Sequence, residues 1–173
     1  MNSSIYLRPL VADDAKVSYR WRNNPDVWKH SRFNPSEIIT IDTESKWLIE
    51  SLSCKDQIRF AICMEGTEEY IGNVQLIKIT KKDAEFHFFI GQPRWWGKGI
   101  GYKASSLILN YAFSNLKLQS ISLEVHNENN AALAIYHRHG FVTKEICHPY
   151  NLMELTNKTF FNVTTQVPSN LLY

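Results

Sequence analysis

Three glycines at alternate positions, Gly97, Gly99 and Gly101, follow an apolar stretch and precede a long helical pattern. The stretch Phe88 to Ile90 is typical of the end of a strand, and the helix is expected to begin at Ile100. Glycine adopts positive φ readily and lets a ligand approach the backbone closely. The unpaired N–H groups at a helix start favour an anion, by roughly 0.3–1 kcal/mol for each charge–dipole interaction. The segment therefore predicts a site where several amides hold a pyrophosphate.

Two other phosphate-binding patterns do not fit this segment. A P-loop requires Ser or Thr after its Gly-Lys, whereas Lys98 is followed by Gly99. A dinucleotide fingerprint requires G-x-G-x-x-G within a βαβ unit, and these glycines have a different spacing. A nucleotide-dependent, kinase-like enzyme is therefore disfavoured. A glycine-rich turn that only reverses the chain is the alternative to a phosphate site.

Two segments in this order resemble the signatures of the GNAT superfamily of N-acetyltransferases. The acetyl-CoA motif of that family is Q/R-x-x-G-x-G/A, and Trp96, Gly99 and Gly101 occupy its named positions. Trp96 departs from the usual Gln or Arg, and the Trp-Gly-Lys-Gly form is similar to the branch that acylates ribosomal-protein N-termini and related substrates. The second signature, N-x-x-A/S-x-x-x-Y-x-x-x-G-F, is matched at Asn129, Ala132, Tyr136, Gly140 and Phe141. The resemblance covers roughly residues 5–161 and is most specific over 85–141.

The resemblance implies a single N-acetyltransferase domain over residues 1–173, with a CoA-binding core at about 85–141. Acetyl-CoA is the implied cosubstrate, with its pyrophosphate on the amides from Gly97 to Tyr102. The strand Phe88 to Ile90 is expected to run beside the pantetheine and pair with its amides. The full set of expected cofactor-binding residues is Phe88, Phe89, Ile90, Trp96, Gly97, Lys98, Gly99, Ile100, Gly101, Tyr102, Asn129 and Tyr136.

Acetyl transfer to an amine needs a base that removes a proton from the amine and an acid that protonates the leaving thiolate. Tyr136 is the expected acid because tyrosine stays protonated at neutral pH, and a buried core aromatic is its alternative role. Glu124 and Glu85 are both candidates for the base, and His87 lies two residues from Glu85, so it could assist or replace that carboxylate. A register shift of one residue would reverse either strand face, so the sequence does not choose between them.

The family resemblance places the acceptor site among the first two helices and the last strands. Aromatic and arginine side chains there suit stacking on a nucleotide or sugar, or cation–π contact with an amine. The segment Trp21-Arg22-Asn23-x-Pro25-x-Val27 resembles acetyltransferases of nucleotide-linked amino sugars. A peptide or ribosomal-protein N-terminal amine, a polyamine and a CoA-binding module without turnover remain open, although few acidic residues in the first forty disfavour a polycation. The expected acceptor-site residues are Trp21, Arg22, Asn23, Trp28, His30, Arg32, Phe33, Trp47, His148 and Tyr150.

Composition limits the other classes of function. The 173 residues carry a net charge of +2, so nucleic acid is not an expected partner. Three dispersed cysteines exclude a disulfide framework, and His137 and His139 are two apart on a helix, so we expect no metal site. No membrane span or secretory leader is visible, which indicates a cytoplasmic protein. A monomer or homodimer is expected.

The pattern of elements indicates how these residues are positioned. Short turns between three strands predict an antiparallel meander, and the second half alternates strand, helix, strand, helix and strand. The expected fold class is therefore α+β, a mixed and mainly antiparallel sheet flanked by helices. Strands are expected at 5–10, 58–64, 70–80, 85–91, 119–126, 141–147 and 152–161, and helices at 13–23, 42–53, 100–116 and 129–139.

Overall fold

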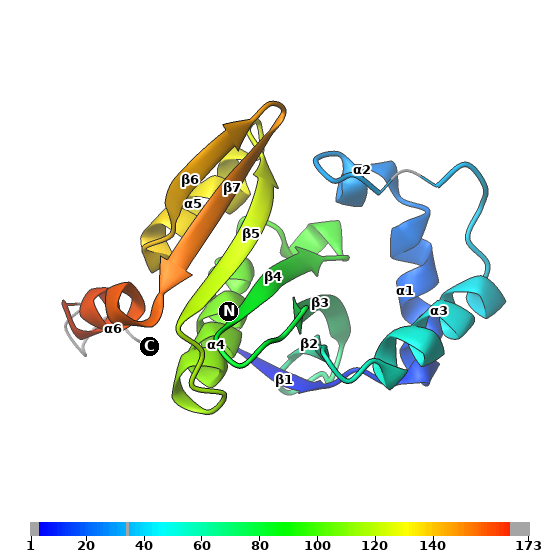
Figure 1. The fold of residues 1–173 in the computed structure, drawn as a ribbon. Helices are drawn as coiled ribbons and strands as arrows, with labels where there is room; N and C mark the ends of the chain where they lie inside the picture. The colour runs from blue at the N-terminus through cyan, green and yellow to red at the C-terminus, as the bar shows by residue number, and fades with distance from the viewer. Residues whose placement is uncertain (1–3, 34, 167–173) are drawn as a thin grey trace.

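The computed structural model describes residues 4–33 and 35–166. One seven-stranded sheet, in the order β1-β2-β3-β4-β5-β7-β6, forms the centre of the molecule (Figure 1). The β4–β5 pair is parallel, and the other five pairs are antiparallel. The strands are β1 (Ile5–Pro9), β2 (Ile58–Met64), β3 (Tyr70–Ile77), β4 (Asp83–Ile90), β5 (Ser120–His126), β6 (Val142–Cys147) and β7 (Tyr150–Thr156).

Helices cover both faces of this sheet (Figure 1). They are α1 (Ala15–Arg22), α2 (Pro25–Trp28), α3 (Ile41–Ser53), α4 (Ile100–Ser114), α5 (Asn130–His139) and α6 (Asn157–Gln166), with the 3-10 turns η1 (Ala12–Asp14) and η2 (Pro93–Trp95). No helix within the described ranges is long and apolar enough to cross a membrane.

Two apolar clusters show which helices pack on which face. The larger one joins strand residues such as Ile62 and Phe86 to Ile108 of α4 and Tyr136 of α5. The smaller one packs α1 and α3 against the opposite side of β2, including Ala61 and Cys63. Ala61 and Ile62 are neighbours in one strand, so the alternation along β2 sends them into different cores. The predicted α+β class and mixed, mainly antiparallel sheet are confirmed.

The last predicted strand is wrong in its second half. β7 ends at Thr156, and residues 157–166 form α6 instead of continuing the strand. The Oγ1 of Thr156 accepts the amide hydrogen bond of Thr159 at 3.2 Å, which caps the new helix. Phe160 then packs on Phe113 of α4 with ring centroids 5.2 Å apart.

Smaller differences occur near the N-terminus. α3 begins at Ile41, one residue before its predicted start, and the side chain of Thr40 caps it by accepting the amide of Thr43. α1 ends at Arg22, one residue before its predicted end, and Pro25 begins the short helix α2. Asn24 caps this helix through a 3.0 Å bond from the amide of Asp26.

Candidate active site

The glycine-rich turn is open to solvent at the start of α4. Gly97 and Gly99 have φ of 70° and 75°, and a Cβ added at either would meet nothing within 4 Å. Gly101 differs, because a Cβ there would lie 2.9 Å from the Phe88 ring and 3.0 Å from Ile135. Gly97 and Gly99 therefore give the turn its left-handed backbone on the side open to solvent. Gly101 allows α4 to pack closely on β4 and α5. The free amides of the turn can face an anion.

Side chains on either side of the turn hold it in place. The Trp96 indole donates a 2.8 Å hydrogen bond to the carbonyl of Ile90, which ties the turn to the end of β4. Lys98 Nζ lies 4.7 Å from the Trp95 ring centroid. On the α4 side, the Tyr102 ring stacks on His139 with centroids 4.4 Å apart. Asn129 does not reach this turn by a hydrogen bond that we observe, and its side chain instead caps α5 by accepting the Ala132 amide.

β4 and β5 separate beside this turn. Their parallel pairing covers only Asp83–Glu85 with Ser120–Ser122, although β4 continues to Ile90 and β5 to His126. Figure 1 shows the two strands diverging toward their carboxyl ends. Backbone groups of β4 beyond Glu85 therefore lack a β5 partner, and an extended ligand could pair with them.

Tyr136 lies on the face of the sheet that α4 and α5 cover, next to the separation between β4 and β5. Its ring contacts Phe86 and Phe88 of β4 edge to face, with centroids 6.1 and 6.0 Å away. The residue is 6% exposed, and burial raises the pKa of its hydroxyl above the usual value of about 10. We observe no hydrogen bond to this hydroxyl from residues 4–33 or 35–166. The group therefore stays protonated at neutral pH and is available to donate.

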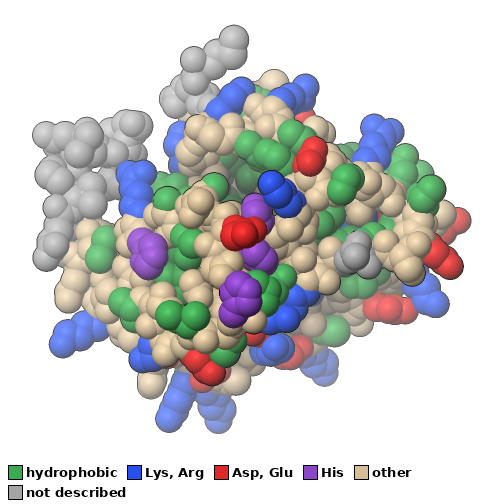
Figure 2. Space-filling view, turned by 90° about the horizontal axis from the view of Figure 1, so that it is seen from above, with side chains coloured by type: hydrophobic (Ala, Val, Ile, Leu, Met, Phe, Trp, Pro, Cys, Tyr) green, Lys and Arg blue, Asp and Glu red, His purple; other side chains and the backbone are tan. Residues whose placement is uncertain are grey.

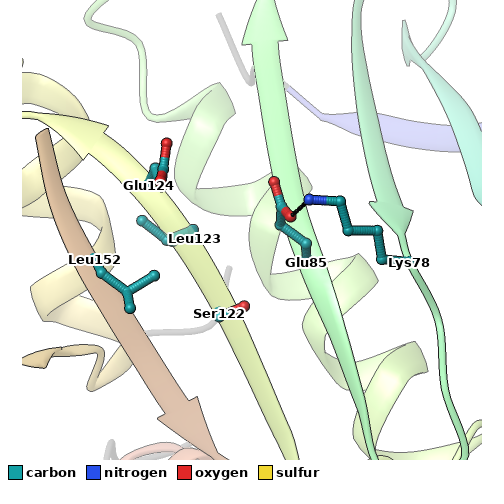
Figure 3. Close-up of a pocket in the computed structure, with 6 residues that line it drawn as sticks. All are labelled: Lys78, Glu85, Ser122, Leu123, Glu124 and Leu152. Atoms are coloured by element: carbon teal, nitrogen blue, oxygen red, sulfur yellow. Dashed lines mark hydrogen bonds and ion pairs between the residues drawn. The ribbon is translucent and has the colours of Figure 1, made fainter.

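Glu85 and Glu124 lie on the other face of the sheet and line one small pocket of about 150 Å³ (Figure 3). This resolves the question of strand face that the sequence left open, because Glu85 on β4 and Glu124 on β5 share a face. Ser122 and Leu152 line the same pocket, together with Lys78 at the end of β3.

The two carboxylates have different partners. Glu85 accepts from Lys78 Nζ at 2.6 Å and bonds His87 Nε2 at 2.7 Å. Burial raises the pKa of Glu85, but the hydrogen bonds from Lys78 and His87 outweigh it, so its pKa lies below the usual range. Glu124 is half exposed and pairs with Arg32 Nη2 at 3.2 Å. Lys78 was not singled out in the sequence, and Arg32 was expected at the acceptor site but not as the partner of Glu124, because the two residues are distant in the chain.

A wider hollow of about 850 Å³ lies between the end of α1, α2 and the following segment, whose Arg32 reaches Glu124 of the small pocket. Phe89, on the same face of β4 as His87, packs on Trp28 with ring centroids 4.8 Å apart and so links the strand to the hollow. The lining side chains include Arg22, Asn23, Trp28, Lys29, Ser31 and Phe33.

Some expected acceptor-site residues are structural. Trp21 is 4% exposed and packs on Tyr70 with ring centroids 4.6 Å apart. Arg22 reaches the hollow but is held by Glu44 at 3.1 Å and lies 4.3 Å from the Trp47 ring centroid. Others meet at the opposite rim, where Arg32 stacks 4.0 Å from the Tyr150 ring centroid and His30 faces His126. His148 bonds Asn127.

Comparison with known proteins agrees with this geometry. The acetyltransferase (GNAT) domain family matches residues 4–142. The spermidine N(1)-acetyltransferase of Escherichia coli is 31% identical over 150 residues, covering 85% of this chain and 78% of that protein. The acetyltransferase PseH of Campylobacter jejuni is 26% identical over 132 residues, covering 76% and 79% of the two chains.

A solved structure shows the same arrangement of elements. The spermidine N-acetyltransferase of Vibrio cholerae, crystallised with CoA and spermine, superposes with a TM-score of 0.81 at 26% identity. The match covers 93% of this chain and all of that one. The chain belongs to the GNAT acetyltransferase family. It is an acyl-CoA-dependent N-acetyltransferase, and acetyl-CoA is its cosubstrate.

Proposed function

We propose that this enzyme transfers the acetyl group to the single amine of a nucleotide-linked amino sugar, in the separation between β4 and β5. Acetyl-CoA enters from the α4 side, where the amides from Gly97 to Tyr102 hold its pyrophosphate. The exposed, left-handed Gly97 and Gly99 support this placement. The pantetheine then runs along Phe88, Phe89 and Ile90, beside backbone that β5 leaves unpaired.

Tyr136 is the proposed acid. The thioester lies between β4 and β5. Its leaving sulfur faces the α4 and α5 side of the sheet, where Tyr136 contacts Phe86 and Phe88. Burial keeps the Tyr136 hydroxyl protonated at neutral pH. It donates this proton to the sulfur as the C–S bond breaks, and protonating the sulfur prevents the reverse attack on the new amide.

Glu124 is the proposed base. It lies on β5 beyond the last residue that pairs with β4, so it flanks the opening itself. Its single observed ion-pair partner, Arg32, is 62% exposed and can move aside. Glu85 is the poorer base because two partners hold it and its pKa is lowered. The role proposed for Glu85 is to orient His87 on the acceptor side.

The acceptor class follows from charge. Both carboxylates that line the 150 Å³ pocket already face a cation, Lys78 for Glu85 and Arg32 for Glu124. A polyamine with several positive charges gains little from carboxylates that are neutralised in this way. A nucleotide diphosphate instead brings negative charge toward Lys29, which lines the hollow beside Arg22, already paired with Glu44, and the acidic Asp26 and Glu37. The 850 Å³ hollow has room for a nucleotide, and Phe33 and Trp28 offer rings for a base to stack on.

A polyamine is the second candidate, because relatives at 31% and 26% identity are spermidine N-acetyltransferases. It differs from the first proposal in one requirement. Spermidine has to displace Lys78 or Arg32 from their carboxylates before its own amines can bind there.

Thiol release from acetyl-CoA tests the acceptor class. The enzyme is incubated with a nucleotide-linked amino sugar, spermidine, a peptide with a free α-amine and no amine. We expect fast release with the first substrate alone. Release with spermidine alone supports the polyamine alternative, and release with the peptide alone supports N-terminal acetylation. Binding of acetyl-CoA without release in any arm contradicts the proposed function.

A further inference from the structure

Two histidines and a glutamate from distant parts of the chain meet at the rim of the acceptor opening. His30 follows α2, His126 ends β5, and Glu128 lies in the turn before α5. One ligand atom from each lies within 4.8 Å of the others. Figure 2, seen from above, shows histidine side chains gathered next to acidic groups near the middle of this face.

The His30 ring carries an unusual feature. Its Nδ1 atom is buried and has no hydrogen-bond partner among the described residues. Folded proteins rarely leave a buried polar atom unpaired, because its lost contact with water is not replaced. Its nearest aromatic neighbour here is another imidazole, His126, with ring centroids 5.4 Å apart. A metal ion bound through His30 Nδ1 would satisfy this nitrogen.

We propose that His30, His126 and Glu128 form a binding site for a zinc-class transition-metal ion. Two imidazole nitrogens and one carboxylate oxygen are a ligand set that suits Zn²⁺, whereas Mg²⁺ and Ca²⁺ prefer oxygen ligands alone. The site needs modest closure, since zinc ligands lie roughly 2.0–2.2 Å from the ion. Glu128 is exposed and free to change rotamer, so closure does not require movement of the sheet.

His126 makes one bond that the metal must replace. Its Nδ1 accepts the amide of Glu128 at 3.2 Å, a long hydrogen bond. Coordination through Nδ1 displaces this amide, and coordination through Nε2 requires the ring proton to move to Nδ1. Either change costs this one bond and gains a metal–nitrogen bond. The ion therefore competes with a weak local contact and not with a buried ion pair.

The ion would tie the segment after α2 to the end of β5. Arg32 and Glu124 already link the same two segments, two residues from His30 and His126 respectively. Metal binding thus adds a second connection across the acceptor opening. The ion takes no part in the acetyl-transfer chemistry, and its binding is independent of which amine is the acceptor.

Isothermal titration of the full-length, reduced protein with ZnCl₂, without acetyl-CoA or acceptor, tests the site. We expect one zinc ion to bind per chain. Zinc affinity should be at least tenfold weaker in His30→Ala and His126→Ala, and it should also fall clearly in Glu128→Gln. Glu128 is exposed, so that variant folds even if a histidine variant does not. His137→Ala and Cys147→Ser, both at exposed side chains, serve as controls and should bind like the wild type. No binding, or unchanged binding in Glu128→Gln and both histidine variants, overturns the proposal.

Hydrogen exchange tests the connection between the segments. With zinc, amides at residues 29–33 and 126–128 should exchange more slowly in the wild type, and this slowing should be absent in His126→Ala. The same slowing with Mg²⁺ in place of zinc would contradict a transition-metal site. Unchanged exchange in a wild-type protein saturated with zinc would contradict the bridge.

Discussion

Arg32 and Glu124 are 92 positions apart in the chain, yet Arg32 Nη2 and Glu124 Oε2 lie 3.2 Å from each other. The pair joins the segment after α2 to the strand that lines the small pocket. Both side chains are at least half exposed, so the pair contributes at most about 1 kcal/mol to stability. An acceptor can therefore displace Arg32 at little cost, which leaves Glu124 free to take a proton.

Replacing each glutamate separately distinguishes the two candidate bases. Glu124→Gln removes the proposed base and should lower kcat/KM by about 10²-fold or more. Glu85→Gln keeps the shape of the pocket. It should lower kcat/KM by less than about tenfold, because Glu85 only orients His87. Steady-state thiol release across pH measures both. A larger loss of kcat/KM in Glu85→Gln than in Glu124→Gln assigns the base to Glu85. Full activity in both variants rules out a carboxylate base.

Tyr136→Phe removes one hydroxyl from a buried ring. We expect kcat to fall by about 10²- to 10⁴-fold because the thiolate loses its proton donor. Acetyl-CoA affinity and the melting temperature should change little, since this hydroxyl makes no hydrogen bond with the described residues. Rapid-quench kinetics with calorimetric binding separates these effects. A wild-type kcat in the variant would leave Tyr136 only its packing role.

Gly99→Ala tests the phosphate turn, and Gly66→Ala is its matched control. Both glycines have left-handed φ, 75° and 82°, and neither has an atom within 4 Å of an added Cβ. Each substitution should therefore cost about 1–2 kcal/mol of stability. Only Gly99→Ala should weaken acetyl-CoA binding, by about tenfold, because Gly66 lies in the β2–β3 turn. Equal acetyl-CoA affinity in the two variants would contradict binding at the Gly99 turn.

His139 makes stability depend on pH. Burial, with a smaller contribution from the charge of Arg138, lowers the pKa of His139 from 6.5 to about 4. The unfolded chain therefore binds this proton first as the pH falls. The stability from neutral His139 is complete above about pH 6.5 and is lost by about pH 4, an effect of about 3 kcal/mol.

Urea unfolding of the wild type and His139→Gln at pH 7, 6, 5 and 4 measures this contribution. The free energy of unfolding should fall more steeply with acid in the wild type than in the variant. The hydrogen bond between His139 Nε2 and Ser105, at 2.8 Å, connects this titration to the second turn of α4. Parallel pH dependence in the two proteins would show that His139 titrates near its usual pKa.

Much of the fold could be predicted because its signals are local. Alternation along β2 and the glycines before α4 specify elements within a few residues, and β2 was placed without error. The helix at residues 157–166 was missed because Phe160 and Phe161 suit a strand equally well. The Thr156 cap and packing on Phe113 favour the helix.

The site was less predictable because its partners are distant in sequence. Tyr136 and both glutamates could be proposed from motif and position, and their roles stay predictions. The strand face of Glu85 depends on its register with β3, where Ile77 lies opposite it, and this register also brings Lys78 close. His30 and His126 meet only because β5 and the segment after α2 share one rim.

The comparison of three amines under the same conditions tests the central claim most directly. kcat/KM is measured for a nucleotide-linked amino sugar, for the same amino sugar without its nucleotide, and for spermidine. We expect kcat/KM for the nucleotide-linked sugar to exceed both others by about 10²-fold or more. Phe33→Ala, which removes a ring from the hollow, should reduce this advantage. A higher kcat/KM for spermidine, or equal values for the sugar with and without its nucleotide, would contradict the account.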